Sequence, residues 1–135
     1  MFTICREFSF CYGHRLLKHN GKCAHLHGHN GTVKIVLCGE RRDDTGMVVD
    51  FGELKKDVGL WIEENLDHRM ILARKDPLVA VLSEMNEPLF LMDENPTAEN
   101  LAKLIFDKTV EFGFPVVSVT FGETDECSAE FSIAG

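Results

Sequence analysis

The sequence predicts an α+β domain in which a four-stranded antiparallel sheet packs against two long helices on one face. Three observations predict this class. Apolar residues alternate with a period of two near both ends of the chain, they recur with helical spacing in the middle, and the two patterns are segregated. Strand pairs that are separated from the helices favour an antiparallel sheet with the helices on one side.

The predicted elements follow in order. Residues 2–12 and 30–40 alternate as strands do, and a polar turn then leads into a short extended segment at 47–51. The spacing of apolar residues predicts an amphipathic helix over 53–65, and a shorter helix after Pro77.

A second long helix is expected after Asn95-Pro96-Thr97, where polar caps and a proline open it, and Gly113 ends it. Two further strands, 116–122 and 129–133, enclose a turn. A four-stranded sheet has two edges that pairing between subunits would cover, so we expect an oligomer.

The composition indicates one domain over residues 1–135, because the chain has no repeat, low-complexity tract or linker. Five cysteines without scaffold-like spacing favour a reducing cytoplasm. No apolar run reaches the roughly 20 residues of a membrane helix, and no signal-peptide pattern opens the chain. We therefore expect a cytoplasmic protein without a membrane partner.

The formal net charge of −8 argues against nucleic acid as a partner, because phosphate backbones call for a cationic face. No acidic residue lies between Glu7 and Glu40, where several basic residues fall: Arg15, Lys18, Lys22 and Lys34. This stretch is either a positive zone that attracts a small anionic substrate or a partly buried strand that is short of charge. The sequence leaves both interpretations open.

Histidines provide the strongest functional signal. His27 and His29 fall on one face of an extended segment, and His14 lies where the first strand would pair with the second. Three neutral imidazoles are the protein ligands of a catalytic zinc site, which keeps its fourth position open. His25 shares the parity of the pair, so spacing alone does not decide which three bind; His19 is expected in a solvated loop.

Other candidates have competing interpretations. Cys23 is a packing residue, a fourth metal ligand or a reactive base, whereas the other cysteines (Cys5, Cys11, Cys38 and Cys127) are expected to pack in or beside strands. Asp67-His68 is either a proton-transfer pair or a helix-end pair. Glu123 could accept two parallel hydrogen bonds from an amidine-like edge.

Taken together, these motifs resemble the 6-pyruvoyl-tetrahydropterin synthase / 6-carboxy-tetrahydropterin synthase family. The resemblance covers almost the whole chain in the family's order. The matching stretches are F-S-F-C-Y-G-H-R (8–15), C-A-H-L-H-G-H-N (23–30), T-G-M-V-V-D-F-G-E-L-K (45–55), L-D-H (66–68), N-P-T-A-E-N (95–100) and G-E-T (122–124).

The resemblance implies a tunnelling fold (T-fold), in which the sheets of several subunits join in a barrel, usually a hexamer made of two trimers. It implies active sites at subunit interfaces and a small-molecule substrate, 7,8-dihydroneopterin triphosphate. It also assigns roles: zinc on His14, His27 and His29; Cys23 as catalytic base; Asp67 and His68 as a relay from a neighbouring subunit; and Glu123, helped by Thr97 and Glu99, as the pterin anchor.

The spacing between the cysteine and the histidine pair selects a branch of this family. C-x3-HGH in this chain is similar to the enzymes of queuosine and 7-deazaguanine synthesis, whereas the pyruvoyl enzymes have C-x5-HGH. The implied reaction yields 6-carboxy-5,6,7,8-tetrahydropterin, triphosphate and acetaldehyde. The alternatives are a pyruvoyl product, an aldolase-like cleavage of the side chain and, outside enzymes, a structural zinc-binding module. The long segment between Met70 and Glu94 departs from the compact members and borders both catalytic motifs.

Overall fold

Two long strands form the centre of the sheet: β1 (Phe2–His14) and β2 (His27–Gly39). In this computed structural model, which describes residues 1–133, they pair antiparallel over their full length, and His14 lies opposite His27. Successive strand residues face opposite sides of the sheet. The even-numbered residues of β1, such as Phe10 and Tyr12, therefore face the core, whereas the odd-numbered ones face away.

The sheet has six strands among the described residues, in the order β4-β3-β1-β2-β5-β6. On one side of the central pair, β5 (Val116–Gly122) and β6 (Ser128–Ser132) continue the antiparallel pattern, as predicted. On the other side, β3 (Arg69–Ala73) and β4 (Leu89–Met92) pair parallel to β1 and to each other.

The predictions of four strands and of a purely antiparallel sheet are therefore wrong. The two additional strands lie in the segment that was expected to hold only a short helix. Both are short apolar runs, and such runs cannot be told from helix by periodicity alone.

One long helical segment crosses the core face of the sheet, and it confirms the helix predicted over 53–65. It is built from α1 (Phe51–Leu54), a π-helical stretch (Lys55–Gly59) and α2 (Leu60–Asn65). The segment predicted to be extended at 47–51 is irregular instead, with bends at residues 48 and 49, and Phe51 already begins α1. Asp50 caps this helix because its side chain accepts the Gly52 N–H at 2.8 Å.

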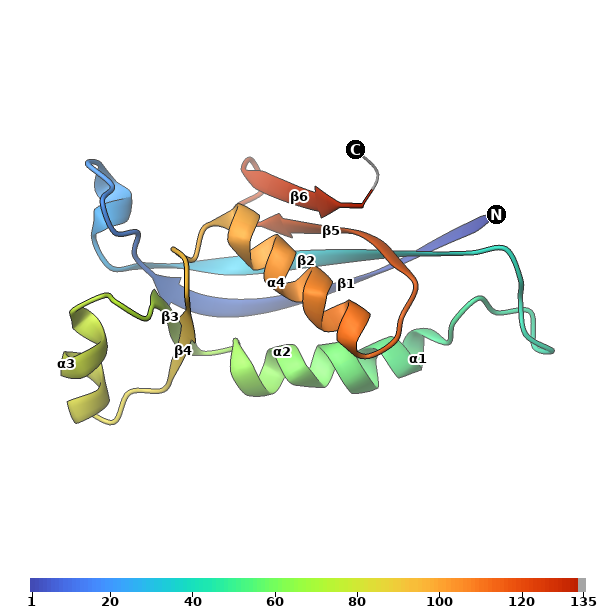
Figure 1. Cartoon of the computed structure of the whole chain (residues 1–135), viewed down its shortest axis with the longest axis horizontal. Helices are drawn as coiled ribbons and strands as arrows, with labels where there is room; N and C mark the ends of the chain where they lie inside the picture. Colours follow the sequence, from blue (N-terminus) through green and yellow to red (C-terminus); the bar gives the residue numbers. More distant parts are fainter. Residues whose placement is uncertain (134–135) are drawn as a thin grey trace.

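The second long helix, α4 (Ala98–Glu111), lies on the same face, as predicted (Figure 1). Thr97 caps its start, and the chain leaves it at Gly113, whose φ of 90° suits glycine. Leu101 and Ile105 of α4 are fully buried against the sheet. The α+β class and the position of both helices are thus confirmed.

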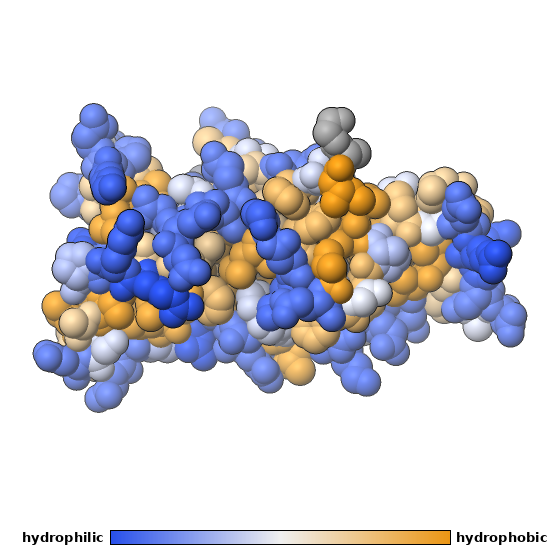
Figure 2. All heavy atoms as spheres, viewed as in Figure 1, coloured by the Kyte–Doolittle hydropathy of each residue, from blue (hydrophilic) through white to orange (hydrophobic). Residues whose placement is uncertain are grey.

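The shorter elements gather at one end of the molecule (Figure 1). α3 (Leu78–Glu84) connects β3 with β4, and a single 3-10 turn, Lys22–Ala24, lies in the loop between β1 and β2. Hydrophilic residues cover much of the face shown in Figure 2, with a hydrophobic patch beside the C-terminal end. Within the part of the chain that the structure describes, no helix has the length and apolar character needed to cross a membrane.

Candidate active site

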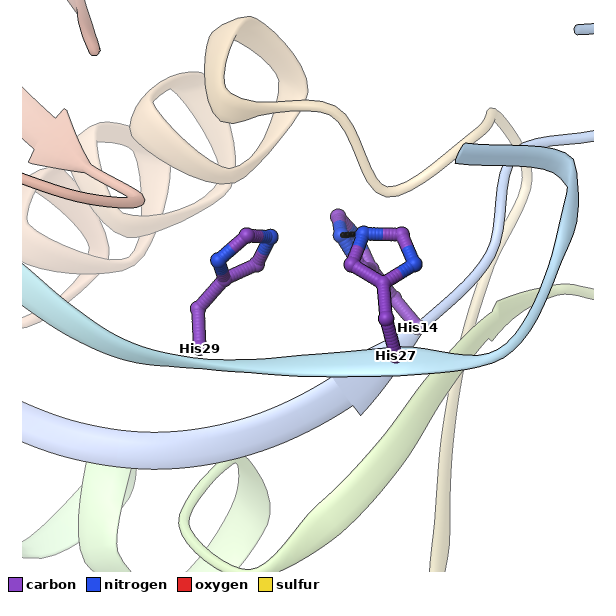
Figure 3. A group of neighbouring side chains, drawn as sticks. All are labelled: His14, His27 and His29. Carbon is purple, nitrogen blue, oxygen red and sulfur yellow. Dashed lines mark hydrogen bonds between the residues drawn. The ribbon is translucent and has the colours of Figure 1, made fainter. Parts of the chain in front are cut away.

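Three histidine side chains meet on the core face of the sheet, where β1 ends and β2 begins (Figure 3). His14 comes from β1, while His27 and His29 come from β2, two residues apart as the strand period requires. The ring centroids are 4.5 to 5.1 Å apart. Each ring offers one nitrogen to a common space, and these nitrogens lie within 4.8 Å of one another.

Hydrogen bonds fix the tautomers of two of these rings. His14 donates from Nδ1 to the carbonyl of Pro96 at 2.8 Å, and His27 donates from Nδ1 to the carbonyl of His25 at 2.7 Å. A carbonyl oxygen only accepts, so both protons lie on Nδ1 and both Nε2 atoms carry lone pairs. The two Nε2 atoms are 3.0 Å apart. Two lone pairs at this distance repel each other, so either a shared proton or a metal ion lies between them.

His29 and the burial of His14 also favour a metal ion at this site. Nε2 of His29 is buried without a hydrogen-bond partner among the described residues. Burial, with a smaller contribution from the neighbouring His27 and His29, lowers the pKa of His14 to about 4, although its bond to Pro96 opposes this. His14 is therefore neutral at neutral pH, as a metal ligand must be. The three donors fit a metal ion.

The structure separates the other histidines of this region from the group. His25 is exposed and contributes its backbone carbonyl, and His19 lies in an exposed loop, as expected. The choice between His25, His27 and His29, which spacing left open, is thus decided by position. Backbone hydrogen bonding to a metal-ligating histidine is the usual way in which its orientation is fixed.

Cys23 lies in the 3-10 turn between the two histidine-bearing strands and is half-buried. Its carbonyl accepts the Leu16 N–H at 2.8 Å, which ties the turn to the end of β1. The atoms that group around the histidine nitrogens do not include its sulfur. The geometry therefore favours a three-histidine group with an open position over a closed four-ligand site.

Glu123 follows β5 directly and reaches the edge of the histidine group. Its Oε2 is 3.5 Å from Nε2 of His29, and its side chain is partly buried. Tyr12, two residues before His14 on β1, places a buried hydroxyl in the same region, and this hydroxyl has no hydrogen-bond partner within residues 1–133. Burial, and secondarily the charge of Glu123, raises the pKa of Tyr12. Sequence reasoning missed Tyr12; its parity with His14 was the available signal.

Asp67 and His68 lie between α2 and β3, with the imidazole Nδ1 3.0 Å from the carboxylate Oδ2. The backbone N–H of Cys11 donates to Asp67 Oδ1 at 3.1 Å. Burial is the largest single effect on the pKa of Asp67 and raises it, but the hydrogen bonds from His68 and Cys11 outweigh it, so this pKa lies below its usual value.

The Asp67-His68 pair and the histidine group lie on opposite sides of β1. The neighbour of the pair on this strand is Cys11, whose side chain faces away from the core, whereas Tyr12 and His14 face it. A single chain therefore does not bring His68 to His14. Cys11 was expected to be a packing residue; the structure instead places its thiol 3.4 Å from Nε2 of His68.

The other residues singled out in the sequence, Thr97, Glu99 and the basic residues, lie in different parts of the structure. Thr97 uses its hydroxyl to accept the Asn100 N–H at 3.1 Å, and Glu99 is exposed in the first turn of α4. Arg15 pairs with the buried Asp76, with Nε donating to Oδ2 at 2.8 Å. That pair neutralises one of the basic residues of the predicted positive zone, whereas Lys18, Lys22 and Lys34 stay exposed.

Comparisons with known proteins identify the family of this chain. The family model described as 6-pyruvoyl tetrahydropterin synthase matches residues 3–133. A relative from Rickettsia conorii named 6-carboxy-5,6,7,8-tetrahydropterin synthase is 37% identical over 96% of this chain and 99% of its own length. A relative of the same name from Synechocystis is 35% identical over 97% of this chain and 93% of its own length.

Two crystal structures are similar along nearly the whole chain. The structure of 6-pyruvoyl tetrahydropterin synthase from Caenorhabditis elegans has a TM-score of 0.72 at 29% identity and covers 97% of this chain and 94% of its own. An uncharacterized protein from Wolinella succinogenes has a TM-score of 0.82 at 28% identity, with 98% of both chains covered. The T-fold expectation is consistent with these neighbours, and the chain belongs to the 6-pyruvoyl tetrahydropterin synthase family.

Proposed function

We propose that this chain is a zinc-dependent lyase that converts 7,8-dihydroneopterin triphosphate and water to 6-carboxy-5,6,7,8-tetrahydropterin, with release of triphosphate and acetaldehyde, in queuosine and 7-deazaguanine synthesis. The relatives from Rickettsia conorii and Synechocystis carry the name of this enzyme over more than nine tenths of their length. The observation that carries the proposal is the pair of Nε2 lone pairs of His14 and His27, which face each other at 3.0 Å.

His14, His27 and His29 would hold the zinc ion, and the fourth position would stay open for the substrate's side-chain hydroxyls. Bound zinc acts as a Lewis acid that polarises those oxygens and acidifies the neighbouring carbon-bound proton. The carbonyls of Pro96 and His25 orient two of the ligands.

The proton transfers are assigned to side chains on two subunits. Cys23, in the turn beside the histidine strands, acts as the base on one face of the substrate. His68 moves protons on the other face, with Asp67 holding its Nδ1 at 3.0 Å. Because Asp67 and His68 face away from the histidine group of their own chain, they serve the site of a neighbouring subunit.

Substrate binding is assigned to a carboxylate and to loop lysines. Glu123, whose Oε2 is 3.5 Å from His29 Nε2, would accept the amidine-like edge of the pterin through two parallel hydrogen bonds. Thr97 and Glu99, at the start of α4, would help this anchor to hold the pterin. Lys18 and Lys22 are exposed in the loop that carries Cys23 and would attract the triphosphate.

The proposed assembly is a cytoplasmic homohexamer of two trimers, formed when sheets of neighbouring subunits join at their edges. β4 and β6 are the edge strands of this chain, and a hydrophobic patch lies beside the C-terminal end near β6 (Figure 2). Exposed edges with apolar surroundings pair readily with another chain.

The test is incubation of the purified, zinc-loaded protein with 7,8-dihydroneopterin triphosphate, with products identified by mass. The expected products are the carboxy-pterin and acetaldehyde in equal amounts. Formation of a pyruvoyl-tetrahydropterin without acetaldehyde would assign this chain the reaction of a 6-pyruvoyl tetrahydropterin synthase instead. Unreacted substrate would contradict both.

A second measurement separates the enzyme from a structural zinc module. In Cys23→Ala, turnover should be lost while zinc content and cooperative unfolding persist, because Cys23 is assigned as a base. Loss of zinc together with folding would make Cys23 a structural ligand and overturn the lyase assignment. Cys127→Ala, a change at an exposed cysteine, is the control and should leave both properties unchanged.

A further inference from the structure

Three different metal-ligating side chains meet on the outward face of β1, away from the three histidines. Cys11 Sγ lies 3.6 Å from His68 Nδ1 and 3.8 Å from Asp67 Oδ1. His68 Nδ1 in turn lies 3.0 Å from Asp67 Oδ2. One ligand atom from each residue falls within 4.8 Å of the other two.

Two of these separations are close to those of ligands around one zinc ion. With bonds of about 2.3 Å to sulfur and about 2.0 Å to nitrogen or oxygen, tetrahedral angles place sulfur about 3.5 Å from each lighter ligand and the two lighter ligands about 3.3 Å apart. The Sγ–Nδ1 distance of 3.6 Å and the Nδ1–Oδ2 distance of 3.0 Å differ from these values by a few tenths of an ångström. The 3.8 Å contact of Sγ is with the other carboxylate oxygen, Oδ1, and Sγ also lies 3.4 Å from Nε2 of His68, so the exposed imidazole must turn for all three side chains to reach one ion. Thiolate, imidazole and carboxylate are also the donor types that zinc prefers.

We propose that Cys11, Asp67 and His68 form a second zinc site, separate from the three-histidine group. Binding would displace the thiol proton of Cys11 to solvent and leave zinc with sulfur, nitrogen and oxygen ligands from one chain, with water as the fourth. The backbone N–H of Cys11, which holds Asp67 Oδ1 at 3.1 Å, would fix the carboxylate so that Oδ2 faces the ion.

A hydrated ion has a path to this site. Cys11 and His68 line the wall of a surface cavity, which also includes Glu87 and Met85 from the segment between β3 and β4. The His68 side chain is 77% exposed, and Asp67 is 29% exposed. Glu87 and Arg69 both line this cavity and carry opposite charges, and Asp67 adds a carboxylate beside it through its contact with His68.

Occupation of the second site would block the proton relay of the proposed function. Zinc would take His68 Nδ1 and the Asp67 carboxylate, which the relay requires, so free zinc beyond the first equivalent would inhibit turnover. This consequence rests on the proposed function. Zinc binding at Cys11 does not, and it is measured separately.

The binding test uses the full chain, stripped of metal and dialysed against buffered zinc, with zinc per chain measured by atomic emission. Wild type should bind about two zinc ions per chain, Cys11→Ala about one, and Cys5→Ala about two. Cys5 is the matched control because it lies on the same strand and the same face, six residues away, and is outside the ligand group. One zinc in the wild type, or two in Cys11→Ala, overturns the proposal.

Alkylation of the wild-type protein tests the site without any substitution. Peptide mass measurements after treatment with iodoacetamide should show that a second equivalent of zinc protects Cys11 and leaves Cys5 reactive. Equal labelling of Cys11 at one and two equivalents overturns the proposal even if a second ion binds elsewhere.

The regulatory consequence is tested by the ratio of turnover at two equivalents of zinc to turnover at one. This ratio should be severalfold below one in the wild type and close to one in Cys11→Ala. If zinc protects Cys11 but turnover is unaffected, the second site exists and the relay assignment of Asp67 and His68 fails. If neither protein turns over, the proposed function fails while the binding result still stands.

Discussion

At the scale of single residues, the function rests on where two protons sit. Carbonyls from two different segments hold the Nδ1 protons of His14 and His27, and this leaves the facing Nε2 atoms as bases. Without a cation the arrangement is repulsive. The local backbone thus orients the two rings as a metal ion would need, and backbone carbonyls set these orientations as much as the strand period does.

The histidine that spacing could not separate from the ligands gives a matched pair of variants. His27→Ala should lose the metal of this group, and activity with it, because two imidazoles bind zinc far more weakly than three. His25→Ala should keep both, since His25 contributes its backbone carbonyl. Metal content by atomic emission is the measurement: it should fall by about one ion per chain in His27→Ala and stay unchanged in His25→Ala, and an unchanged content in His27→Ala would contradict the assignment.

A buried ion pair beside the site gives a prediction about stability. Arg15 neutralises Asp76, whose side chain is fully buried, so Arg15→Met would leave an unpaired buried charge and lower the free energy of unfolding by about 3 kcal/mol at pH 7. The exposed pair Arg74–Asp93 is the control, where Arg74→Met should cost about 0.5 kcal/mol or less. Urea unfolding at one protein concentration measures both.

The same pair has a defined pH dependence. The hydrogen bond from Arg15 holds the pKa of Asp76 below its usual value, despite burial. The unfolded chain therefore binds more protons than the native one, and the stabilisation is present above the unfolded pKa of about 4 and is lost as pH falls through the lower native pKa. The difference between wild type and Arg15→Met should shrink below about pH 4. A difference that stays constant would contradict the ion-pair explanation.

At the scale of elements, local patterns predicted those parts of the fold whose partners are near in sequence. The strand period of β1 and β2 and the caps of α4 are visible in a few residues each. The parallel strands β3 and β4 were missed because they are short and largely apolar, so that periodicity does not identify them. Their pairing also depends on a distant segment of the chain. The contact of Cys11 with Asp67 and His68 was missed for the same reason, since it follows from β3 pairing with β1.

The start of α4 gives a prediction at this scale. Thr97 accepts the Asn100 N–H, so Thr97→Ala should lower the free energy of unfolding by about 1 kcal/mol, while Thr97→Ser should keep it. The proposed role beside the pterin adds a second readout. A rise in KM in Thr97→Ser, with stability unchanged, would show a contact with substrate beyond the cap, whereas an unchanged KM would leave Thr97 as a cap alone.

At the scale of the whole molecule, the sheet separates the two parts of the proposed machinery. The three histidines lie on the core-facing side of the sheet, Cys23 lies in the turn between β1 and β2, and His68 lies on the outward side of β1. The residues proposed for the two half-sites of one chain therefore do not all meet. The sequence identified the candidate residues of both half-sites. It did not predict that they lie on opposite faces of the sheet, which follows from the pairing of β3 with β1. An assembly is the arrangement in which the halves can meet.

Subunit mixing tests this arrangement directly. Cys23→Ala and His68→Ala should each be inactive, yet hexamers formed from equal amounts of both should recover about a quarter of wild-type activity, because one site in four receives Cys23 and His68 from unaltered positions on two chains. Cys23→Ala mixed with His27→Ala is the control. Those residues serve the same half-site, so no mixed site is complete and activity should stay absent. Recovery in neither mixture would place the whole site within one chain, and recovery in the control alone would assign Cys23 and His27 to different subunits.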